Sequence, residues 1–273
     1  MSRSYRLLAA DIDGTIVTSR REVPPGVLSA VRAAQSRGVR VLLATGRIWM
    51  SAEPYIRRVG ADPPAILYNG GLVYDFRANE EWRRVHLDYA HARAVLEILR
   101  AFPEVQPHVY VGDRVYAGTA NELTDRYRRK DGLPVEEVGD LIEFLPRDPM
   151  KILIIGARPD LERVAAEVRA HPMPINTVFS EETYFEILPA GNSKGVALRF
   201  VAEHLRIPLS AVIAVGDNLN DLEMIQTAGL GVAMGNAPEA LKVSAGYVAP
   251  TNDEEGLADV IERFITRGRR EHA

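Results

Sequence analysis

Four short and almost wholly apolar runs in this chain each end at a polar loop that contains glycine. The runs are residues 6–10, 39–44, 65–68 and 211–215. Because they are nearly continuously apolar rather than alternating, both faces of each predicted strand are expected to be covered. A helical apolar stripe at residues 27–34 lies between the first two runs, and another at 196–205 precedes the last. This alternation predicts an α/β fold with a doubly wound, Rossmann-like parallel sheet.

The middle of the chain has a different pattern. Residues 108–116 form two short β-rich runs around a Gly-Asp pair, which is typical of a hairpin. Two helical patterns and two strand-like apolar runs follow, at residues 121–130, 152–155, 160–169 and 184–188. We therefore expect residues 83–188 to form an inserted α+β domain, and residues 1–82 and 189–273 to form the core.

Composition excludes several classes of protein. The 273 residues include 33 basic and 37 acidic side chains, so the chain lacks the excess positive charge typical of nucleic-acid binding. The absence of cysteine excludes disulfides, thiolate metal sites and a thiol nucleophile. No apolar run is long enough for a membrane span or a signal peptide. We expect a cytoplasmic protein without nucleic-acid or membrane partners, with a frayed tail at residues 267–273.

Two acidic loops follow predicted strands of the core. The first contains Asp11 and Asp13, and the second contains Asp217 and Asp221. Read alone, the first could be a solvated acidic turn and the second a helix N-cap. If the loops adjoin, the four carboxylates converge, and two like charges about 4 Å apart repel by about 4 kcal/mol at an effective dielectric near 20. Such a cluster needs a cation, a raised pKa or a lysine, and its all-oxygen donors suit Mg²⁺.

Positive charge and phosphate-binding groups are available elsewhere in the core. Lys194 begins the helical pattern at residues 196–205, where a helix N-terminus favours an anion. Thr45 ends a strand and is followed by Gly46 and Arg47, so a hydroxyl and free backbone N–H groups could hold a phosphate oxygen there. Taken singly, these are an exposed lysine and an ordinary turn. Taken together with the carboxylates, they predict a phosphate site built around a hard metal.

The ordered set of segments resembles the haloacid dehalogenase superfamily phosphatases, and in particular the Cof-like branch with a type IIB cap. The matching segments are Asp11-x-Asp13-Gly14-Thr15, Thr45-Gly46-Arg47, Asn69-Gly70-Gly71, Lys194, Gly216-Asp217-x-x-Asn220-Asp221 and Gly235-Asn236-Ala237. The resemblance extends from about residue 7 to residue 264. It implies that the insert is a cap that contacts the leaving group of the substrate.

The resemblance also implies a mechanism. Asp11 would be the nucleophile that forms an aspartyl-phosphate, and Asp13 would be the general acid and base. Mg²⁺ would be bound by the carboxylate of Asp11, the backbone carbonyl of Asp13 and Asp217. Phosphoryl oxygens would be held by Thr45, Gly46, Lys194 and Asn220, with Arg47, Asn69 and Asp221 in supporting roles. The implied activity is Mg²⁺-dependent hydrolysis of a small phosphorylated metabolite, with a sugar phosphate as the first expectation.

Two other functions remain open at the level of sequence. A phosphomutase would return the phosphoryl group to substrate, and a non-catalytic sensor would only bind a phosphorylated ligand. The oligomeric state is not assigned. Candidate specificity residues in the insert are Tyr110, Arg114, Tyr116, Arg126 and Tyr184, each of which could equally be structural.

Overall fold

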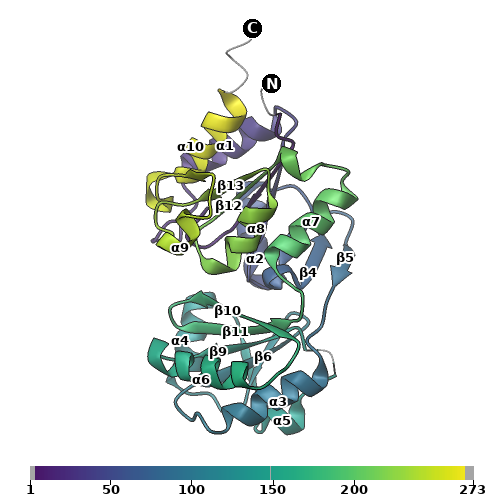
Figure 1. Ribbon diagram of the computed structural model, residues 1–273, viewed down its shortest axis with the longest axis vertical. Helices are drawn as coiled ribbons and strands as arrows, with labels where there is room; N and C mark the ends of the chain where they lie inside the picture. The colour runs from purple at the N-terminus through teal and green to yellow at the C-terminus, as the bar shows by residue number, and fades with distance from the viewer. Residues whose placement is uncertain (1–3, 148, 268–273) are drawn as a thin grey trace. The chain divides into compact units, whose positions relative to one another are not determined.

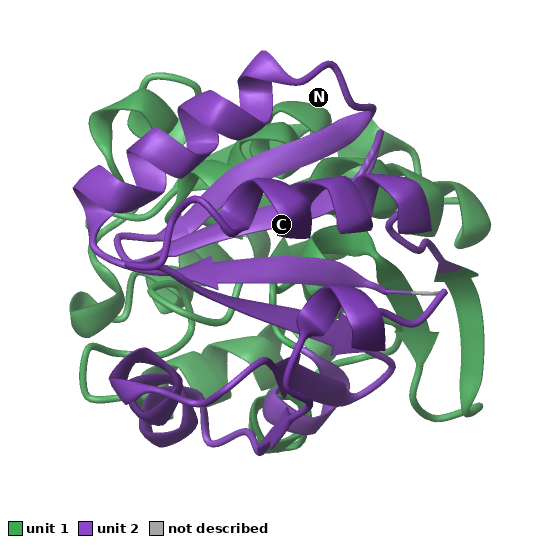
Figure 2. Ribbon diagram, turned by 90° about the horizontal axis from the view of Figure 1, so that it is seen from below, with its two compact units in different colours: residues 1–47, 52–83, 193–273 green, residues 48–51, 84–192 purple. Residues whose placement is uncertain are grey.

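The computed structural model describes residues 4–147 and 149–267, which divide into two compact units (Figures 1 and 2). The first unit comprises the described parts of residues 1–47, 52–83 and 193–273, and the second comprises those of 48–51 and 84–192. Apart from its first residue, the predicted insert lies within the long segment of the second unit. The predicted frayed tail lies outside the described residues, except for Arg267. No helix in the described part of the chain is both long and apolar enough to span a membrane.

The first unit is built on a five-stranded parallel sheet, which contains three of the four predicted apolar runs. Its order is β14-β13-β12-β1-β2. The strands are β1 (Leu7–Ala10), β2 (Arg40–Leu43), β12 (Val212–Gly216), β13 (Leu230–Ala233) and β14 (Tyr247–Val248). Strand β1 is an interior strand, because Leu7 pairs with Val212 on one side and with Arg40 on the other. The loops that follow β1 and β12 therefore leave the sheet at the same edge.

Helices cover both faces of this sheet (Figure 1). They are α1 (Pro25–Gln35), α2 (Trp49–Val59), α7 (Lys194–His204), α8 (Leu222–Thr227), α9 (Glu239–Lys242) and α10 (Gly256–Ile261), followed by a π-helical turn (Glu262–Thr266). Leu7 and Ala9 pack in one core cluster with α7 and α8. Leu8 and Ala10 point to the opposite face and are equally buried, which is why the strand is apolar at every position.

A small antiparallel sheet extends from the edge of the parallel one. Its first strand is the apolar run at residues 65–68, which was expected in the parallel sheet, and its other two strands were missed by the sequence analysis. The small sheet consists of β3 (Ala65–Leu67), β4 (Leu72–Asp75) and β5 (Glu80–Arg84). Its link to the parallel sheet is a bridge between Ala44 and Ile66. The fifth strand has the sequence Glu-Glu-Trp-Arg-Arg and no buried residue, so no apolar pattern marked it. Short turns (Tyr68–Gly70, Leu209–Ala211, Leu219–Asp221 and Asn252–Glu254) connect the elements of this unit.

The second unit contains a six-stranded sheet in the order β10-β11-β9-β6-β7-β8, antiparallel except for the parallel pair β7 and β8. The strands are β6 (Gln106–Val111), β7 (Arg114–Ala117), β8 (Val135–Glu137), β9 (Lys151–Ile155), β10 (Ile175–Glu181) and β11 (Tyr184–Pro189). The predicted hairpin is the β6–β7 pair, in which Val109 lies opposite Tyr116. This sheet is the additional α+β part of the predicted fold.

The helices of this unit lie on different faces of its sheet. They are α3 (Tyr89–Leu99), α4 (Glu122–Asp131), α5 (Leu141–Phe144) and α6 (Arg158–Ala170). The core cluster that contains Val109, Ile152 and Phe185 also contains residues of α3, α5 and α6. The fourth helix instead meets His108 and Tyr110, which alternate with Val109 along β6. The sequence analysis missed α3 although its buried residues recur at helical spacing.

A buried ion pair lies in the second unit. The Lys151 ammonium lies 2.7 Å from Glu186 Oε2, and both side chains are only 4% exposed. The same ammonium lies 4.7 Å from the centre of the Tyr110 ring, which adds a cation–π contact. A buried charge that loses its partner is strongly unfavourable, whereas an apolar pair of similar volume is tolerated. Removing one residue of the pair should therefore destabilise this sheet more than replacing both by apolar residues.

We expect Glu186→Leu to lower the free energy of unfolding by about 3–5 kcal/mol, because it leaves the Lys151 ammonium buried without its carboxylate. The double variant Lys151→Met/Glu186→Leu should recover most of that loss. A matched control is Glu162→Leu, which removes an exposed pair with Arg158 and should cost less than about 1 kcal/mol. Urea unfolding followed by circular dichroism measures all three. A double variant no more stable than Glu186→Leu would contradict the expectation.

Candidate active site

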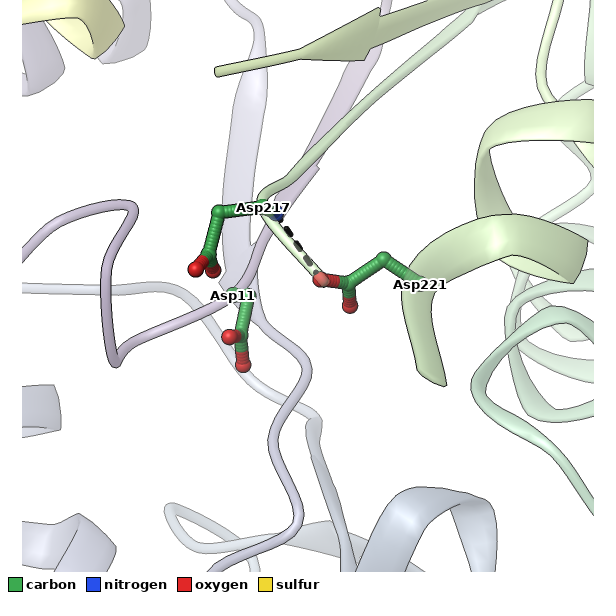
Figure 3. A group of neighbouring side chains, drawn as sticks. All are labelled: Asp11, Asp217 and Asp221. Carbon is green, nitrogen blue, oxygen red and sulfur yellow. Dashed lines mark hydrogen bonds between the residues drawn. The ribbon is translucent and has the colours of Figure 1, made fainter. Parts of the chain in front are cut away.

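Three carboxylates converge at the carboxyl ends of strands β1 and β12 in the parallel sheet. Asp11 directly follows β1, and its N–H donates to the carbonyl of Val215 in the neighbouring strand at 3.0 Å. Asp217 directly follows β12. One carboxylate oxygen from each of Asp11, Asp217 and Asp221 lies within 4.8 Å of the others (Figure 3). Residues remote in sequence thus meet because their strands are parallel neighbours.

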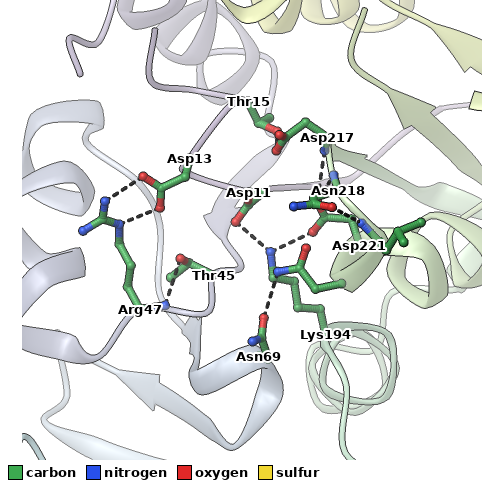
Figure 4. Close-up of polar contacts among 12 residues, drawn as sticks. Asp11, Asp13, Thr15, Thr45, Arg47, Asn69, Lys194, Asp217, Asn218 and Asp221 are labelled. Atoms are coloured by element: carbon green, nitrogen blue, oxygen red, sulfur yellow. Dashed lines mark hydrogen bonds and ion pairs between the residues drawn. The ribbon is translucent and has the colours of Figure 1, made fainter. Parts of the chain in front are cut away.

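Lys194 neutralises part of this cluster. Its Nζ lies 2.7 Å from Asp11 Oδ1 and 2.7 Å from Asp221 Oδ1 (Figure 4). The side chain is fully buried, which contradicts the alternative of an exposed surface lysine. It is the first residue of α7, and the Ser193 hydroxyl caps that helix by accepting from the Val196 N–H at 3.0 Å. The capped helix start fixes the position of the ammonium.

Asp221 holds the second acidic loop together. Its Oδ2 accepts the backbone N–H groups of Asp217 at 3.0 Å and Asn218 at 3.1 Å, while its Oδ1 accepts from Lys194. A Cβ at Gly216 would lie 2.3 Å from the Asp221 carboxyl carbon, so only glycine fits there. Both oxygens of Asp221 are therefore engaged within the protein. This suits the orienting role that the resemblance implies for it.

The electrostatics of the cluster show an excess of negative charge. Burial, followed by the neighbouring carboxylates, raises the pKa of Asp217 to about 9. Burial likewise raises the pKa of Asp11 to about 7, although Lys194 opposes that rise. For Lys194 itself, burial disfavours the charge, but Asp11 and Asp221 outweigh it and hold the pKa above the usual value for lysine. One ammonium does not balance three carboxylates.

A hard divalent cation fits this donor set. The converging atoms are carboxylate oxygens, without sulfur or imidazole nitrogen, which suits Mg²⁺. Thr15 Oγ1 donates to Asp217 Oδ1 at 3.1 Å and orients that carboxylate. A Cβ at Gly14 would lie 2.2 Å from Asp217 Oδ2, and Gly14 has φ +73°. The loop after β1 thus approaches Asp217 so closely that a side chain is excluded.

Asp13 does not join the other three carboxylates, contrary to the expected convergence of four. Its two oxygens bind Arg47, at 2.7 Å from Nε and 2.6 Å from Nη2 (Figure 4). A bidentate, charge-assisted pair is favourable, whereas entering a cluster of like charges is not. That the backbone carbonyl of Asp13 binds a metal stays a prediction.

Thr45 is presented as a hydroxyl rather than as a set of free N–H groups. Its own N–H donates to the Ile66 carbonyl at 2.8 Å, and the N–H of Arg47 donates to Thr45 Oγ1 at 3.1 Å. The expectation that these two N–H groups are free is therefore wrong, because they stabilise the loop itself. Since Oγ1 accepts from Arg47, the Thr45 hydroxyl proton is left to donate elsewhere.

Two asparagines on separate loops meet beside this turn. Asn220 Nδ2 donates to Asn69 Oδ1 at 3.0 Å. A Cβ at Gly46 would lie 3.0 Å from Asn69 Nδ2, so the backbone of Gly46 runs against the Asn69 amide. The structure therefore brings Thr45, Gly46 and Asn220 together around Asn69. These are residues for which the resemblance implies phosphoryl binding or support.

The loop after Asp13 is held by asparagines from the C-terminal part of the chain. Asn236 Nδ2 donates to the Gly14 carbonyl at 2.9 Å, and the Asn252 N–H donates to Asn236 Oδ1 at 3.2 Å. Asn252 Nδ2 donates to the Val17 carbonyl at 2.8 Å. Asn236 lies in a matching segment, but sequence reasoning missed Asn252, whose place inside a Thr-x-x-Glu capping box indicates only a helix start.

The candidate specificity residues of the insert all have partners within it. The pairs are Tyr110 with Tyr127, Arg114 with Glu136, Tyr116 with Phe144, Arg126 with Glu122 and Tyr184 with Asp131. A role for any of them in specificity stays a prediction.

Known proteins match this chain over most of its length, and solved structures among them have the same fold. The family model of the haloacid dehalogenase-like hydrolases matches residues 8–261. The pyridoxal phosphate phosphatase YbhA of Escherichia coli is 29% identical, over 94% of this chain and 97% of its own. The 5-amino-6-(5-phospho-D-ribitylamino)uracil phosphatase YitU of Bacillus subtilis is 28% identical, over 95% and 97%. A haloacid dehalogenase-like hydrolase from Bacteroides thetaiotaomicron has a crystal structure that superposes with a TM-score of 0.84, at 29% identity, over 95% of this chain and 99% of that one.

In the metal-free protein, the contribution of Asp11 and Asp217 to the free energy of unfolding should fall as pH rises. Folding raises the pKa values of Asp11 and Asp217 from 3.8 to about 7 and about 9, so the folded state binds more protons than the unfolded state. The contribution of these two groups to the free energy of unfolding is fully present below about pH 4. It is lost as pH rises through the folded pKa values. Asp217→Asn should lessen this loss and be more stable than wild type at about pH 8, by an amount on the order of 1 kcal/mol.

Thermal unfolding in the presence of a chelator, at about pH 5 and about pH 8, tests this prediction. A suitable control is Glu203→Gln, which removes an exposed charge on α7 away from the cluster. An equal loss of stability in wild type and in Asp217→Asn would show that the carboxylates do not repel one another as described.

Proposed function

Because the chain belongs to the haloacid dehalogenase-like hydrolases, and to the Cof-like phosphatases among them, we propose that this site hydrolyses a small phosphorylated metabolite with Mg²⁺ as cofactor. The observation that carries the proposal is the buried ammonium of Lys194 between Asp11 and Asp221, beside Asp217. Such a site can receive a phosphoryl group next to a carboxylate nucleophile. Catalysis of phosphoryl transfer depends mainly on positioning and on neutralising charge, which this arrangement provides.

Asp11 is the proposed nucleophile. One of its oxygens is fixed by Lys194 at 2.7 Å, which leaves the other to attack phosphorus and form an aspartyl-phosphate while the alkoxide leaves. Attack requires the ionised carboxylate, and Lys194 favours that form. Mg²⁺, held by Asp11 and Asp217, would supply the positive charge that the cluster lacks and would neutralise phosphoryl oxygens. Water then hydrolyses the acyl phosphate and regenerates Asp11.

Asp13 is the proposed general acid and base. It would give a proton to the leaving oxygen and afterwards take one from the attacking water. In the structure both of its oxygens are bound to Arg47, with the Asp13 side chain 46% exposed and that of Arg47 11% exposed. Proton transfer to an ester therefore requires at least one of these hydrogen bonds to open. The exposure of Asp13 allows such a movement.

The phosphoryl oxygens would be held by hydrogen-bond donors around Asp11. Two of the three N–H groups of the Lys194 ammonium are directed at carboxylates, which leaves the third for a phosphoryl oxygen. The Thr45 hydroxyl proton and an N–H of Asn220 are the other donors. These groups come from three separate segments, so the fold determines their spacing.

The site supports a class of substrates, small phosphate esters, rather than one compound. A sugar phosphate is the first expectation, and the relatives named above favour testing pyridoxal phosphate and 5-amino-6-(5-phospho-D-ribitylamino)uracil beside it. A phosphomutase on the same residues would return the phosphoryl group to substrate. Release of inorganic phosphate from a panel of such esters, with Mg²⁺ and with a chelator, separates the two activities. We further propose a cytoplasmic location, where such metabolites are available.

Asp11→Asn should lower phosphate release by at least about 1000-fold, because the amide is a poor nucleophile, and should leave the circular dichroism spectrum unchanged. Loss of wild-type activity in a chelator and its return with excess Mg²⁺ test the cofactor in the same assay. Glu203→Gln serves as the control for removing a carboxylate. Normal turnover by Asp11→Asn would refute the assignment of the nucleophile.

Asp13→Asn should affect substrates according to their leaving groups. Hydrolysis of an alkyl phosphate should fall by about 100-fold to 10,000-fold, because its alkoxide needs a proton. Single-turnover formation of p-nitrophenolate from p-nitrophenyl phosphate should fall much less, since this leaving group is stable without one. If both substrates lose the same factor in single-turnover measurements, Asp13 is not the acid.

A further inference from the structure

The turn at Tyr68–Gly70 has an unusual backbone. Tyr68, Asn69 and Gly70 all have positive φ, at +53°, +52° and +100°. Residues other than glycine rarely adopt this left-handed backbone conformation, and asparagine tolerates it better than most. Tyr68 and Asn69 are both only 1% exposed. A buried conformation of this kind persists only where the surroundings hold it in place.

This turn contacts the segments that carry the phosphoryl-binding groups. Tyr68 N–H donates to the Arg47 carbonyl at 3.1 Å, and Asn69 N–H donates to the Thr45 carbonyl at 3.0 Å. A Cβ at Gly70 would lie 2.2 Å from the carbonyl oxygen of Ser193, the residue that caps the helix of Lys194. The turn therefore fixes the backbone around Thr45 relative to the start of α7.

The Asn69 side chain extends this contact to Asn220. Asn69 Oδ1 accepts from Asn220 Nδ2 at 3.0 Å, while Asn220 Oδ1 is buried without a hydrogen-bond partner among the described residues. The orientation of the Asn220 amide thus depends on Asn69. The distinction matters for an anion, because Nδ2 donates hydrogen bonds to it whereas Oδ1 repels it.

We propose that Asn69 is a positioning residue that keeps the amide nitrogen of Asn220 directed for binding the phosphoryl group. This inference rests on the proposed function, in which Asn220 holds a phosphoryl oxygen. Asparagine combines the two properties that the position requires: it accepts a left-handed backbone, and it offers a neutral acceptor. Glycine would keep only the first property, and aspartate would add a negative charge beside the phosphate.

Asn69→Gly isolates the role of the side chain, since glycine adopts the same φ without strain. With p-nitrophenyl phosphate as substrate and inorganic phosphate as inhibitor, both in Mg²⁺, we expect the inhibition constant of phosphate to rise by about three- to tenfold. The matched control is Asn79→Gly, which also replaces an asparagine at positive φ, +56°. Asn79 is exposed, and its Oδ1 accepts from the Tyr74 hydroxyl at 2.6 Å, so phosphate inhibition should not change.

Coupling to Asn220 separates positioning from a general structural effect. If Asn69 acts through Asn220, then Asn69→Gly should change phosphate inhibition little when Asn220 is already alanine. The side-chain amide resonances of Asn220 in a nitrogen-15 correlation spectrum should also shift in Asn69→Gly and remain in place in Asn79→Gly. Equal effects of Asn69→Gly in the wild-type and Asn220→Ala backgrounds would overturn the inference.

The outcomes also distinguish this inference from the proposed function. A wild-type protein that neither releases phosphate nor is inhibited by it would refute the proposed function and, with it, the role of Asn69. A wild-type protein that does both, with Asn69→Gly indistinguishable from Asn79→Gly, would refute the role of Asn69 alone.

Discussion

The buried ammonium of Lys194 is the interaction on which the rest of the site depends. A fully buried charge persists only with partners, and here the partners come from the loops after β1 and β12. Lys194 can reach both because its helix packs on the face of the sheet formed by those strands. The apolar core around α7 excludes water, and this strengthens the attraction between Lys194 and the two carboxylates of Asp11 and Asp221. The packing of α7 on the sheet therefore also determines the electrostatics of the site.

The remaining negative charge determines what the site can accept. Three carboxylates against one ammonium favour additional positive charge, and glycines at positions 14 and 216 allow the loops to approach this closely. The donors around Thr45 and Asn220 lie on the same unit and suit an anion. A site that attracts a cation and an anion side by side is suited to phosphate ester chemistry, which agrees with the family to which the chain belongs.

Sequence patterns predicted the parallel sheet and the segments of the site because both depend on local features. Strands buried on both faces are apolar throughout, and the polar residues follow them directly. The contacts of the site that were missed depend on partners remote in sequence. Nothing near Asp13 shows that Arg47 binds it, and nothing near Asn252 shows that it holds the loop at Val17. Strand β5 of the small sheet was missed because it carries charged residues. Helix α3 was missed although its apolar residues recur at helical spacing.

The asparagines that hold the loop after Asp13 have a consequence for a chain that is still being synthesised. The loop lies 222 residues before Asn236 and up to 235 residues before Asn252, so it leaves the ribosome well before these two partners do. Strand β1 likewise pairs with β12 only after residues 212–216 have been made. A nascent chain can therefore have its whole inserted domain translated while the acidic loop after β1 still lacks its partners. The hydrogen bonds that hold the loop after Asp13 can therefore form only once the segment that contains Asn252 has been translated.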